Sequence, residues 1–277
     1  MNRKFALLGE TLGHTMSPPI HKRLFELKGR EFEYDVMEIA PDKLEDNREL
    51  FRSLAGFNIT IPHKISMIDH CDELAESAKR YNSVNCIDNK NGVLTGYNTD
   101  CDGFLQTIRA MEAKLSGKVL LIGCGGVGRM MAIEAALAGA QLYIAVLKSD
   151  MALAEQVGTE ILAMKADAKI NIVLNTEIDP RVGYDLLMNA CPVGMFPKVE
   201  GCPVPDEVIR GSKAVFDVIY NPNETVLMRK ARELGIRAEG GMAMLVWQAV
   251  KAHEIWDGDT YTTAQVQQII QEMQKLV

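Results

Sequence analysis

The sequence predicts an α/β protein of two domains, and three observations support this prediction. The chain has 277 residues, 47% of them hydrophobic and 24% charged, which is enough apolar material for two ordinary globular cores. In its middle part, continuous apolar runs alternate with helical stretches, the pattern of a doubly wound parallel sheet. The part before it mixes strands and helices in a different pattern, which indicates a separate α/β domain.

The first domain begins with an apolar strand at residues 5–9 and a helix from Ser17 to Gly29, with Ser17 as its N-cap and proline in its first turn. Residues 32–36 alternate between apolar and acidic side chains, the period of a half-exposed strand. Three further elements are expected here: a short strand at 57–61, a helix at 69–81, and a hairpin at 84–97 that turns at Asn91-Gly92.

The second domain starts with the apolar run at residues 119–122, followed by glycines and a helix that ends at Gly139. Its other expected elements are strands at 142–147, 170–174, 185–189 and 215–220 and a helix from Asp150. Two helices, at 242–256 and 263–276, end the chain, and we expect them to return to the first domain. We therefore place the first domain at residues 1–103 plus 241–277 and the second, inserted domain at 104–240.

Composition excludes several classes of protein. The net charge is -7 and the charges are interspersed without a basic stripe, so nucleic acid is not an expected partner. The N-terminal apolar run is too short for a signal peptide, and no run is long enough to span a membrane. None of the six cysteines forms a C-x-x-C pair, so we expect reduced, mostly buried thiols in a cytoplasmic protein and no structural zinc.

A glycine-rich loop follows the first strand of the second domain. Gly123-Cys124-Gly125-Gly126-Val127-Gly128 fits G-x-G-x-x-G between a buried strand and a helix. In that setting the first glycine permits the tight turn, the second lets a pyrophosphate approach the backbone, and the third lets the helix pack closely on the sheet. The free N–H groups at the helix start favour phosphate binding, so the loop predicts a dinucleotide site.

The next strand ends at the position that separates NAD from NADP in such sites, where a carboxylate bonds the ribose hydroxyl and an arginine accepts the 2′-phosphate. Here Lys148, Ser149 and Asp150 occupy it. Lys148 and Ser149 suit a phosphate, whereas Asp150 suits a hydroxyl or caps the following helix, so both cofactors stay open at this point.

Three short polar segments follow or end predicted strands of the first domain, the usual location of a ligand site. They are residues 13–18, 58–64 and 98–100. A lysine partly removed from water can exchange protons, and a nearby carboxylate orients it, so Lys64 and Asp100 are the candidate proton-handling pair. Taken singly, Lys64 also fits a solvated surface charge and Asp100 a turn residue.

The hydroxyls of Thr15, Ser17 and Thr60 likewise have ordinary explanations as caps or exposed strand positions. His14 and His21 have no carboxylate partner at a metal-binding spacing, and we expect a structural role for both and no metal.

Taken together, these segments resemble the shikimate dehydrogenase family. The matching motifs are His14-x-x-Ser17-Pro18-x-Ile20-His21, Asn58-Ile59-Thr60-Ile61-Pro62-x-Lys64, Ser83-Val84-Asn85, Gly96-x-Asn98-Thr99-Asp100-x-x-Gly103, the glycine loop, Asn189-Ala190-x-Pro192-x-Gly194-Met195, Asp217-Val218-Ile219-Tyr220-x-Pro222-x-x-Thr225 and Gly241-x-x-Met244-Leu245-Val246-x-Gln248-Ala249. They span nearly the whole chain in the family's order. The resemblance implies an α/β substrate-binding domain and a Rossmann-like NADP domain with a cleft between them, and reversible NADP-linked reduction of 3-dehydroshikimate to shikimate in aromatic amino-acid (chorismate) biosynthesis.

The resemblance also implies a role for individual residues. Lys64 and Asp100 would be the catalytic pair, and Thr15 and Ser17 would bind the substrate carboxylate. Further substrate contacts are implied at Thr60, Asn85, Tyr220 and Gln248. Cofactor contacts are implied at Gly123, Gly125, Gly126, Val127, Gly128, Lys148, Ser149, Asp150, Asn189, Val218 and Gly241.

The chain departs from the family pattern at three positions. Thr15 stands where the family usually has serine, Lys148-Ser149-Asp150 where it usually has Asn-Arg-Thr, and Ala243 where it usually has glycine. The first two leave open a quinate/shikimate dehydrogenase that prefers NAD. A metabolite-sensing regulatory homologue is the non-enzymatic alternative, and a monomer or a homodimer is expected.

Overall fold

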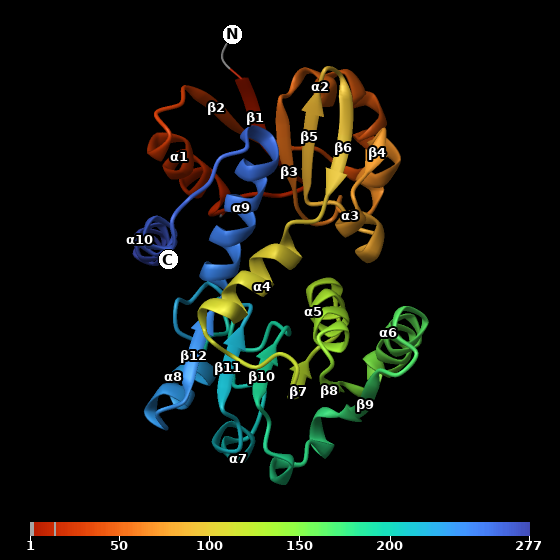
Figure 1. The fold of residues 1–277 in the computed structure, drawn as a ribbon, viewed down its shortest axis with the longest axis vertical. Helices are drawn as coiled ribbons and strands as arrows, with labels where there is room; N and C mark the ends of the chain where they lie inside the picture. Colours follow the sequence, from red (N-terminus) through yellow and green to blue (C-terminus); the bar gives the residue numbers. More distant parts are fainter. Residues whose placement is uncertain (1–2, 14) are drawn as a thin grey trace. The chain divides into compact units, whose positions relative to one another are not determined.

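The computed structural model describes residues 3–13 and 15–277, so His14 lies outside the described residues (Figure 1). The chain divides into two compact units. Unit 1 comprises residues 1–103 and 245–276, and unit 2 comprises residues 104–244 with Val277. The second crossing therefore lies at Met244–Leu245, whereas the sequence placed it between 240 and 241. Two helices carry the chain across the boundaries: α4 (Asp100–Ala110) and α9 (Gly241–Asp257).

Unit 1 contains a mixed six-stranded sheet in the order β2-β1-β3-β5-β6-β4. Its strands are β1 (Arg3–Gly9), β2 (Phe32–Glu38), β3 (Gly56–Ile59), β4 (Glu73–Leu74), β5 (Cys86–Lys90) and β6 (Val93–Tyr97). β1 runs parallel to β2 and β3, whereas β5 runs antiparallel to β3 and β6. The helices of this unit, besides α9, are α1 (Ser17–Leu27), α2 (Arg48–Ser53), α3 (Glu76–Tyr81) and α10 (Thr263–Gln274).

The predicted hairpin of unit 1 is confirmed. β5 and β6 are joined by Asn91 and Gly92, whose φ angles of 57° and 86° are those of the two central residues of a type I′ turn. Asparagine and glycine adopt this left-handed region at the lowest cost, so the sequence pattern alone was sufficient.

Two local predictions for unit 1 are wrong. Ser17 is the first residue of α1 and not its cap; Met16 holds the cap position, and the Thr15 hydroxyl accepts the Ser17 amide at 3.2 Å. Residues 69–81 are not one helix, because a 3₁₀ helix ends at His70, β4 follows it, and only α3 is α-helical. There β4 pairs with β6, and the Ala75 amide bonds the Gly96 carbonyl at 2.9 Å, so sheet pairing overrides local composition.

Unit 2 contains an all-parallel sheet in the order β12-β11-β10-β7-β8-β9. Its strands are β7 (Lys118–Ile122), β8 (Gln141–Val146), β9 (Lys169–Leu174), β10 (Leu186–Asn189), β11 (Ala214–Asp217) and β12 (Arg237–Gly240), and its helices, besides α4, are α5 (Gly126–Leu137), α6 (Met151–Met164), α7 (Asp206–Arg210) and α8 (Val226–Glu233). Read from β9, this is the doubly wound order in which the strand sequence reverses beside the first strand, here between β7 and β10. The predicted fold class is confirmed.

A buried histidine pair lies in the aromatic core of unit 1. His21 and His253 are fully buried, with His21 Nδ1 3.1 Å from His253 Nε2, and both rings pack against Trp256. His253 Nδ1 lies 3.2 Å from the Tyr261 hydroxyl, which donates to the Leu24 carbonyl. The printed contacts fit two neutral rings, with His21 Nε2 buried and without a hydrogen-bond partner, which agrees with the structural role expected for His21.

This pair predicts that the protein loses stability in mild acid. Burial lowers the pKa of His21 to about 3 and that of His253 well below its usual value. In the unfolded chain both histidines bind a proton near pH 6.5, whereas the buried rings stay neutral. The free energy of unfolding is therefore highest above that pH and decreases, by up to about 1.4 kcal/mol per pH unit for each histidine, as the pH falls below it. Thermal unfolding followed by tryptophan fluorescence from pH 7 to pH 5 measures this slope. It should become shallower in His21→Phe, and an unchanged slope contradicts the assignment.

Candidate active site and nucleotide site

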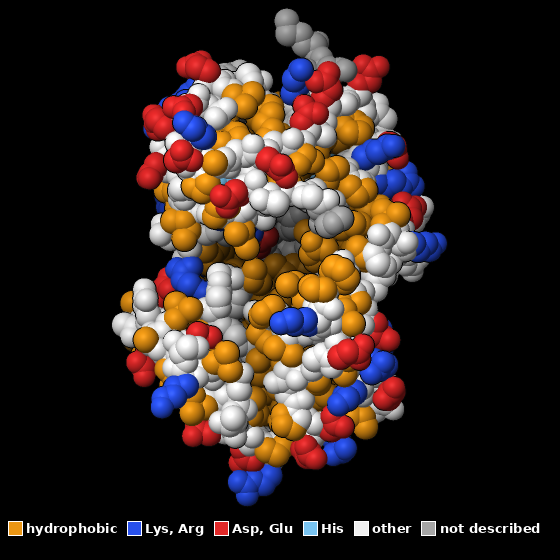
Figure 2. Space-filling view, turned by 180° about the vertical axis from the view of Figure 1, so that it is seen from behind, with side chains coloured by type: hydrophobic (Ala, Val, Ile, Leu, Met, Phe, Trp, Pro, Cys, Tyr) orange, Lys and Arg blue, Asp and Glu red, His pale blue; other side chains and the backbone are white. Residues whose placement is uncertain are grey.

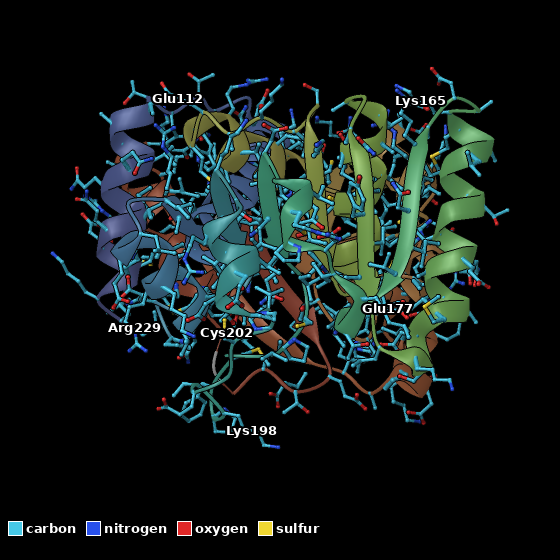
Figure 3. The ribbon with its side chains drawn as sticks, turned by 90° about the horizontal axis from the view of Figure 1, so that it is seen from below. Glu112, Lys165, Glu177, Lys198, Cys202 and Arg229 are labelled. Atoms are coloured by element: carbon cyan, nitrogen blue, oxygen red, sulfur yellow. The ribbon has the colours of Figure 1, made fainter. Side chains whose placement is uncertain are left out.

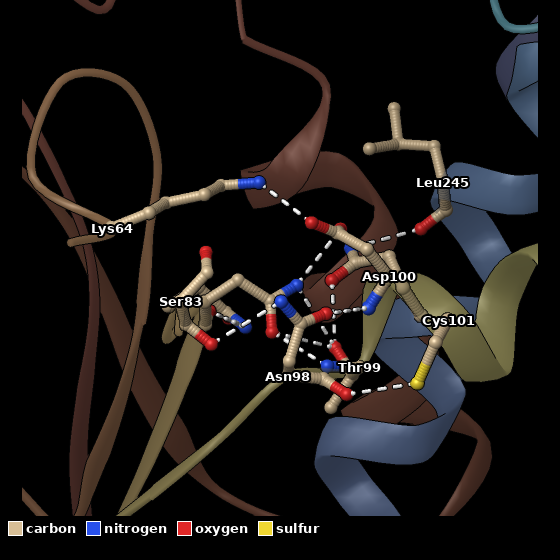
Figure 4. Close-up of polar contacts among 10 residues, drawn as sticks. Lys64, Ser83, Asn98, Thr99, Asp100, Cys101 and Leu245 are labelled. Atoms are coloured by element: carbon tan, nitrogen blue, oxygen red, sulfur yellow. Dashed lines mark hydrogen bonds and ion pairs between the residues drawn. The ribbon is translucent and has the colours of Figure 1, made fainter. Parts of the chain in front are cut away.

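Lys64 and Asp100 form an ion pair in unit 1 (Figure 4). Lys64 Nζ donates to Asp100 Oδ2 at 2.7 Å, and the two side chains retain 24% and 18% of their exposure. Asn85 Nδ2 donates to the other carboxylate oxygen, Asp100 Oδ1, at 2.8 Å. The pair is therefore held in place yet still accessible, as proton exchange with a bound molecule requires.

The backbone around Lys64 is fixed on both sides. The peptide between Ile61 and Pro62 is cis, and the His63 amide bonds the Thr60 carbonyl at 3.0 Å. The Lys64 carbonyl accepts the Val84 amide at 2.7 Å, and buried His63 contacts the Ile39 carbonyl through Nε2 at 2.7 Å. Because the turn is hydrogen-bonded to two other segments, the direction of the Lys64 side chain is set by the fold.

A buried polar network supports Asp100 from the opposite side. Asn85 Oδ1 accepts the Thr99 amide at 2.7 Å, and the Thr99 hydroxyl donates to Gln248 Oε1 at 3.2 Å. Gln248 Nε2 in turn donates to the Leu245 carbonyl at 2.9 Å. The predicted residues Asn85 and Gln248 thus belong to one network with the candidate pair, and Thr99 is a connecting residue that the sequence analysis did not single out.

The predicted carboxylate-binding hydroxyls lie at the start of α1. Ser17 is buried near Tyr34, whose hydroxyl donates to Asn58 Oδ1 at 2.9 Å. Burial raises the pKa of Tyr34 well above its usual value, so this hydroxyl keeps its proton. Thr15 is half-buried beside Ser17, and half-buried Thr60 directly follows β3. Tyr34 was read as an ordinary strand residue, since nothing local to β2 indicates these partners.

The glycine loop of unit 2 has the geometry of a nucleotide-binding turn. Gly123 has a φ of +86°, which the turn after β7 requires. A side chain at Gly128 would place its Cβ 2.5 Å from the Gly123 carbonyl oxygen, so this glycine permits close packing of α5. Around Gly125 and Gly126 there is open space, and half-exposed Val127 follows them in the first turn of α5. The glycines therefore fit the three requirements of a dinucleotide-binding loop: a tight turn, room for a pyrophosphate at the backbone, and close packing of the helix on the sheet.

The turn after β8 is exposed and carries the three residues expected near the cofactor's ribose. Lys148, Ser149 and Asp150 form a single 3₁₀ turn, and the Ser149 hydroxyl donates to Asp150 Oδ1 at 3.0 Å. This turn offers an ammonium and a hydroxyl for a phosphate, together with a carboxylate that favours a hydroxyl.

A pocket of about 370 Å³ opens at the carboxyl ends of β10 and β11. Its lining is Ala190, Cys191, Pro192, Met195, Phe196, Val218, Ile219, Tyr220 and Asn221. Two predicted contacts, Val218 and Tyr220, lie in this wall, whereas Asn189 is fully buried behind it. At Gly241 a Cβ would come within 1.9 Å of the Val218 carbonyl oxygen, so this glycine supports the wall by close packing.

The predicted strand at 215–220 ends earlier than expected, at Asp217. From Val218 onward the backbone leaves the sheet to form the pocket wall, with the Gly241 amide bonded to the Ile219 carbonyl at 3.0 Å. The loop on the other side of the pocket continues past Phe196 to Lys198, which projects away from the strands in Figure 3.

Comparisons with known proteins identify the family. A curated relative from Caldanaerobacter subterraneus subsp. tengcongensis, named shikimate dehydrogenase (NADP(+)), is 34% identical over 263 residues, covering 93% of this chain and 92% of the relative. The chain belongs to the shikimate dehydrogenase family. The sequence model described as the shikimate dehydrogenase substrate binding domain matches residues 7–87, within unit 1.

Solved structures of this family share the fold. A shikimate dehydrogenase in complex with NADP+ has a TM-score of 0.88 at 28% identity, covering 98% of this chain and 95% of that one. A quinate dehydrogenase from Corynebacterium glutamicum in complex with NAD has a TM-score of 0.87 at 27% identity, covering 98% of this chain and 99% of that one. The family thus includes proteins bound to either dinucleotide.

The surface, the helices and the cysteines can each be compared with what composition predicted. On the face drawn in Figure 2, acidic and basic side chains are interspersed. Among the described residues, no helix is long and apolar enough to cross a membrane. All six cysteines are free, although Cys71, Cys191 and Cys202 are only half-buried, so "mostly buried" holds for Cys86, Cys101 and Cys124 alone.

One cluster in unit 1, formed by His253, Asp257 and Asp259, has the composition of a cation site. Arg3 pairs with Asp257, and Arg30 Nη2 lies 2.7 Å from Asp259 Oδ1. Two guanidinium groups thus balance the two carboxylates, which removes the electrostatic drive to bind a metal ion.

Proposed function

We propose that this chain is a shikimate dehydrogenase, an NADP-dependent oxidoreductase that acts on a CH–OH group and interconverts 3-dehydroshikimate and shikimate. The observation that carries this proposal is the accessible Lys64–Asp100 pair in a chain of this family. We also propose that it is a cytoplasmic enzyme, active as a monomer or a homodimer.

The residues of unit 2 fit a dinucleotide. Open backbone at Gly125 and Gly126, the amino end of α5 and the pocket beyond β10 and β11 provide for a pyrophosphate and for a planar ring. Lys148 and Ser149 would bind the 2′-phosphate. Bound there, NADP supplies the hydride in reduction and accepts it in oxidation.

In unit 1, we assign the proton to Lys64. In the direction of reduction, the Lys64 ammonium donates a proton to the substrate oxygen as that oxygen gains negative charge, and the new O–H bond replaces an N–H bond. In oxidation the neutral amine takes the hydroxyl proton back. Asp100 orients the ammonium at 2.7 Å, and its carboxylate also accepts a substrate hydroxyl.

The remaining predicted contacts would hold the substrate. Thr15 and Ser17 would donate hydrogen bonds to its carboxylate, and the two lie side by side, with the Thr15 hydroxyl accepting the Ser17 amide at 3.2 Å. Further ring contacts are proposed at Thr60, Asn85, Tyr220 and Gln248. Fixing the reacting groups in one orientation is the main contribution such contacts make to the rate.

Initial rates with shikimate or quinate, each with NADP or NAD, test the proposal. We expect the largest kcat/KM for shikimate with NADP. The alternative, quinate oxidation with NAD, is favoured by Asp150 and by the lack of an arginine in the turn after β8. A dominant rate for quinate with NAD establishes that alternative. If no pair of substrate and cofactor is turned over, the protein is instead the metabolite-sensing, non-enzymatic homologue.

A further inference from the structure

Asp217 is a fully buried carboxylate at the end of β11, directly behind the pocket of unit 2. Its Oδ1 accepts Asn189 Nδ2 at 3.0 Å and the Ile219 amide at 3.1 Å, and its Oδ2 accepts the Thr225 hydroxyl at 2.8 Å. Three donors thus converge on one carboxylate, with no basic side chain among them.

Each of these partners fixes a different part of the pocket. Asn189 also bonds the backbone of Cys191, accepting its amide at 3.1 Å, and so holds the wall that begins at Ala190. The Ile219 amide belongs to the facing wall. Thr225 caps α8 by accepting the Met228 amide at 3.3 Å, which anchors the chain where it leaves that wall.

Folding stability alone does not account for this choice of residue. Burial raises the pKa of Asp217 to about 6 in spite of its three donors. The ionised form is therefore destabilised near neutral pH, because a raised carboxyl pKa favours folding only when the group is protonated. What the charged carboxylate supplies instead is one acceptor group that orders both walls at once.

We propose that Asp217 is a positioning residue of the cofactor site, holding the two walls of this pocket in the arrangement that receives the nicotinamide half of NADP. In a doubly wound sheet the first strand and its glycine loop bind one half of the dinucleotide, and the strands beyond the reversal point bind the other. β10 and β11 are those strands. The proposal rests on the proposed function, because it assumes that a nicotinamide dinucleotide is the ligand.

Binding measurements with two ligands test this role. NADP reaches both halves of the site, whereas adenosine 2′,5′-bisphosphate occupies only the half at the glycine loop. We expect Asp217→Ala to weaken NADP binding about tenfold or more, or about 1.4 kcal/mol, while the affinity for the bisphosphate changes less than twofold. Thr225→Val should weaken NADP in the same selective way, and Thr225→Ser, which keeps the hydroxyl, should restore wild-type affinity.

Asp185→Asn is the matched control. Asp185 also accepts hydrogen bonds, from the Lys118 amide at 2.9 Å and from the Lys213 ammonium at 2.7 Å. It directly precedes β10, so it lies at the amino ends of the parallel strands, whereas Asp217 lies at their carboxyl ends. Its NADP affinity should equal that of the wild type. Unchanged NADP affinity in Asp217→Ala overturns the proposal, and so does an equal loss for both ligands. If Asp217→Ala does not fold, the two Thr225 variants decide.

Failure of the proposed function would be recognised separately. Wild-type protein that binds NADP but turns over neither shikimate nor quinate contradicts the enzymatic proposal, while the comparison of the two ligands still tests Asp217.

Discussion

Lys64→Ala is expected to lose most of the turnover of shikimate while shikimate still binds. The substitution removes the only group assigned to the proton, and general acid–base catalysis is worth about 10²–10⁴-fold. Asp100 keeps its contact with Asn85 at 2.8 Å, so the remaining polar network stays in place. The measurements are kcat at saturating shikimate and NADP, and the Kd for shikimate by titration calorimetry.

Lys90→Ala provides the matched control. Lys90 Nζ pairs with Asp88 Oδ2 at 2.8 Å, much as Lys64 pairs with Asp100, but its side chain is 69% exposed and it lies at the end of β5 next to the hairpin turn. Its removal should leave kcat and the shikimate Kd unchanged. Wild-type turnover in Lys64→Ala refutes the role given to Lys64. A loss of shikimate binding large enough to account for the lower rate would instead make it a binding residue.

The nucleotide loop was predictable because its requirements are local. The turn after β7, the open backbone at Gly125 and the packing of α5 all depend on residues within one strand–loop–helix unit. A glycine pattern between a buried strand and a helix is therefore sufficient to predict the geometry of the turn. The hairpin at Asn91-Gly92 was predictable for the same reason.

The support around the candidate sites was not predictable, because it joins segments that are distant in sequence. Tyr34 on β2 bonds Asn58 on β3, and Thr99 connects Asn85 to Gln248. None of these side chains is unusual within its own strand or turn. Asp217 appeared only as one position of a family motif, and its three donors come from β10, the pocket wall and the start of α8. The order of the strands in the sheet brings these donors together, and that order cannot be predicted from composition or hydrophobic periodicity.

Alanine at Gly125 and at Gly128 should separate ligand approach from packing within the same loop. A Cβ at Gly125 meets nothing within 4 Å, and its φ of -67° suits any residue. Gly125→Ala should therefore cost no more than about 1 kcal/mol of stability, the range for changes at a helix cap. Its methyl group takes the space through which the pyrophosphate approaches, so NADP affinity should fall about tenfold or more.

Gly128→Ala should behave in the opposite way. Alanine is favoured over glycine inside a helix by about 1 kcal/mol, so without a clash this change would stabilise α5. A Cβ here would lie 2.5 Å from a backbone oxygen, that of Gly123, which cannot move aside as a flexible side chain does. Overpacking of this kind costs about 3 kcal/mol, so the net effect should be a clear fall in Tm with NADP absent. Thermal unfolding without ligand and NADP titration distinguish the two variants. If Gly125→Ala lowers Tm as much as Gly128→Ala, the division of roles within the loop is wrong.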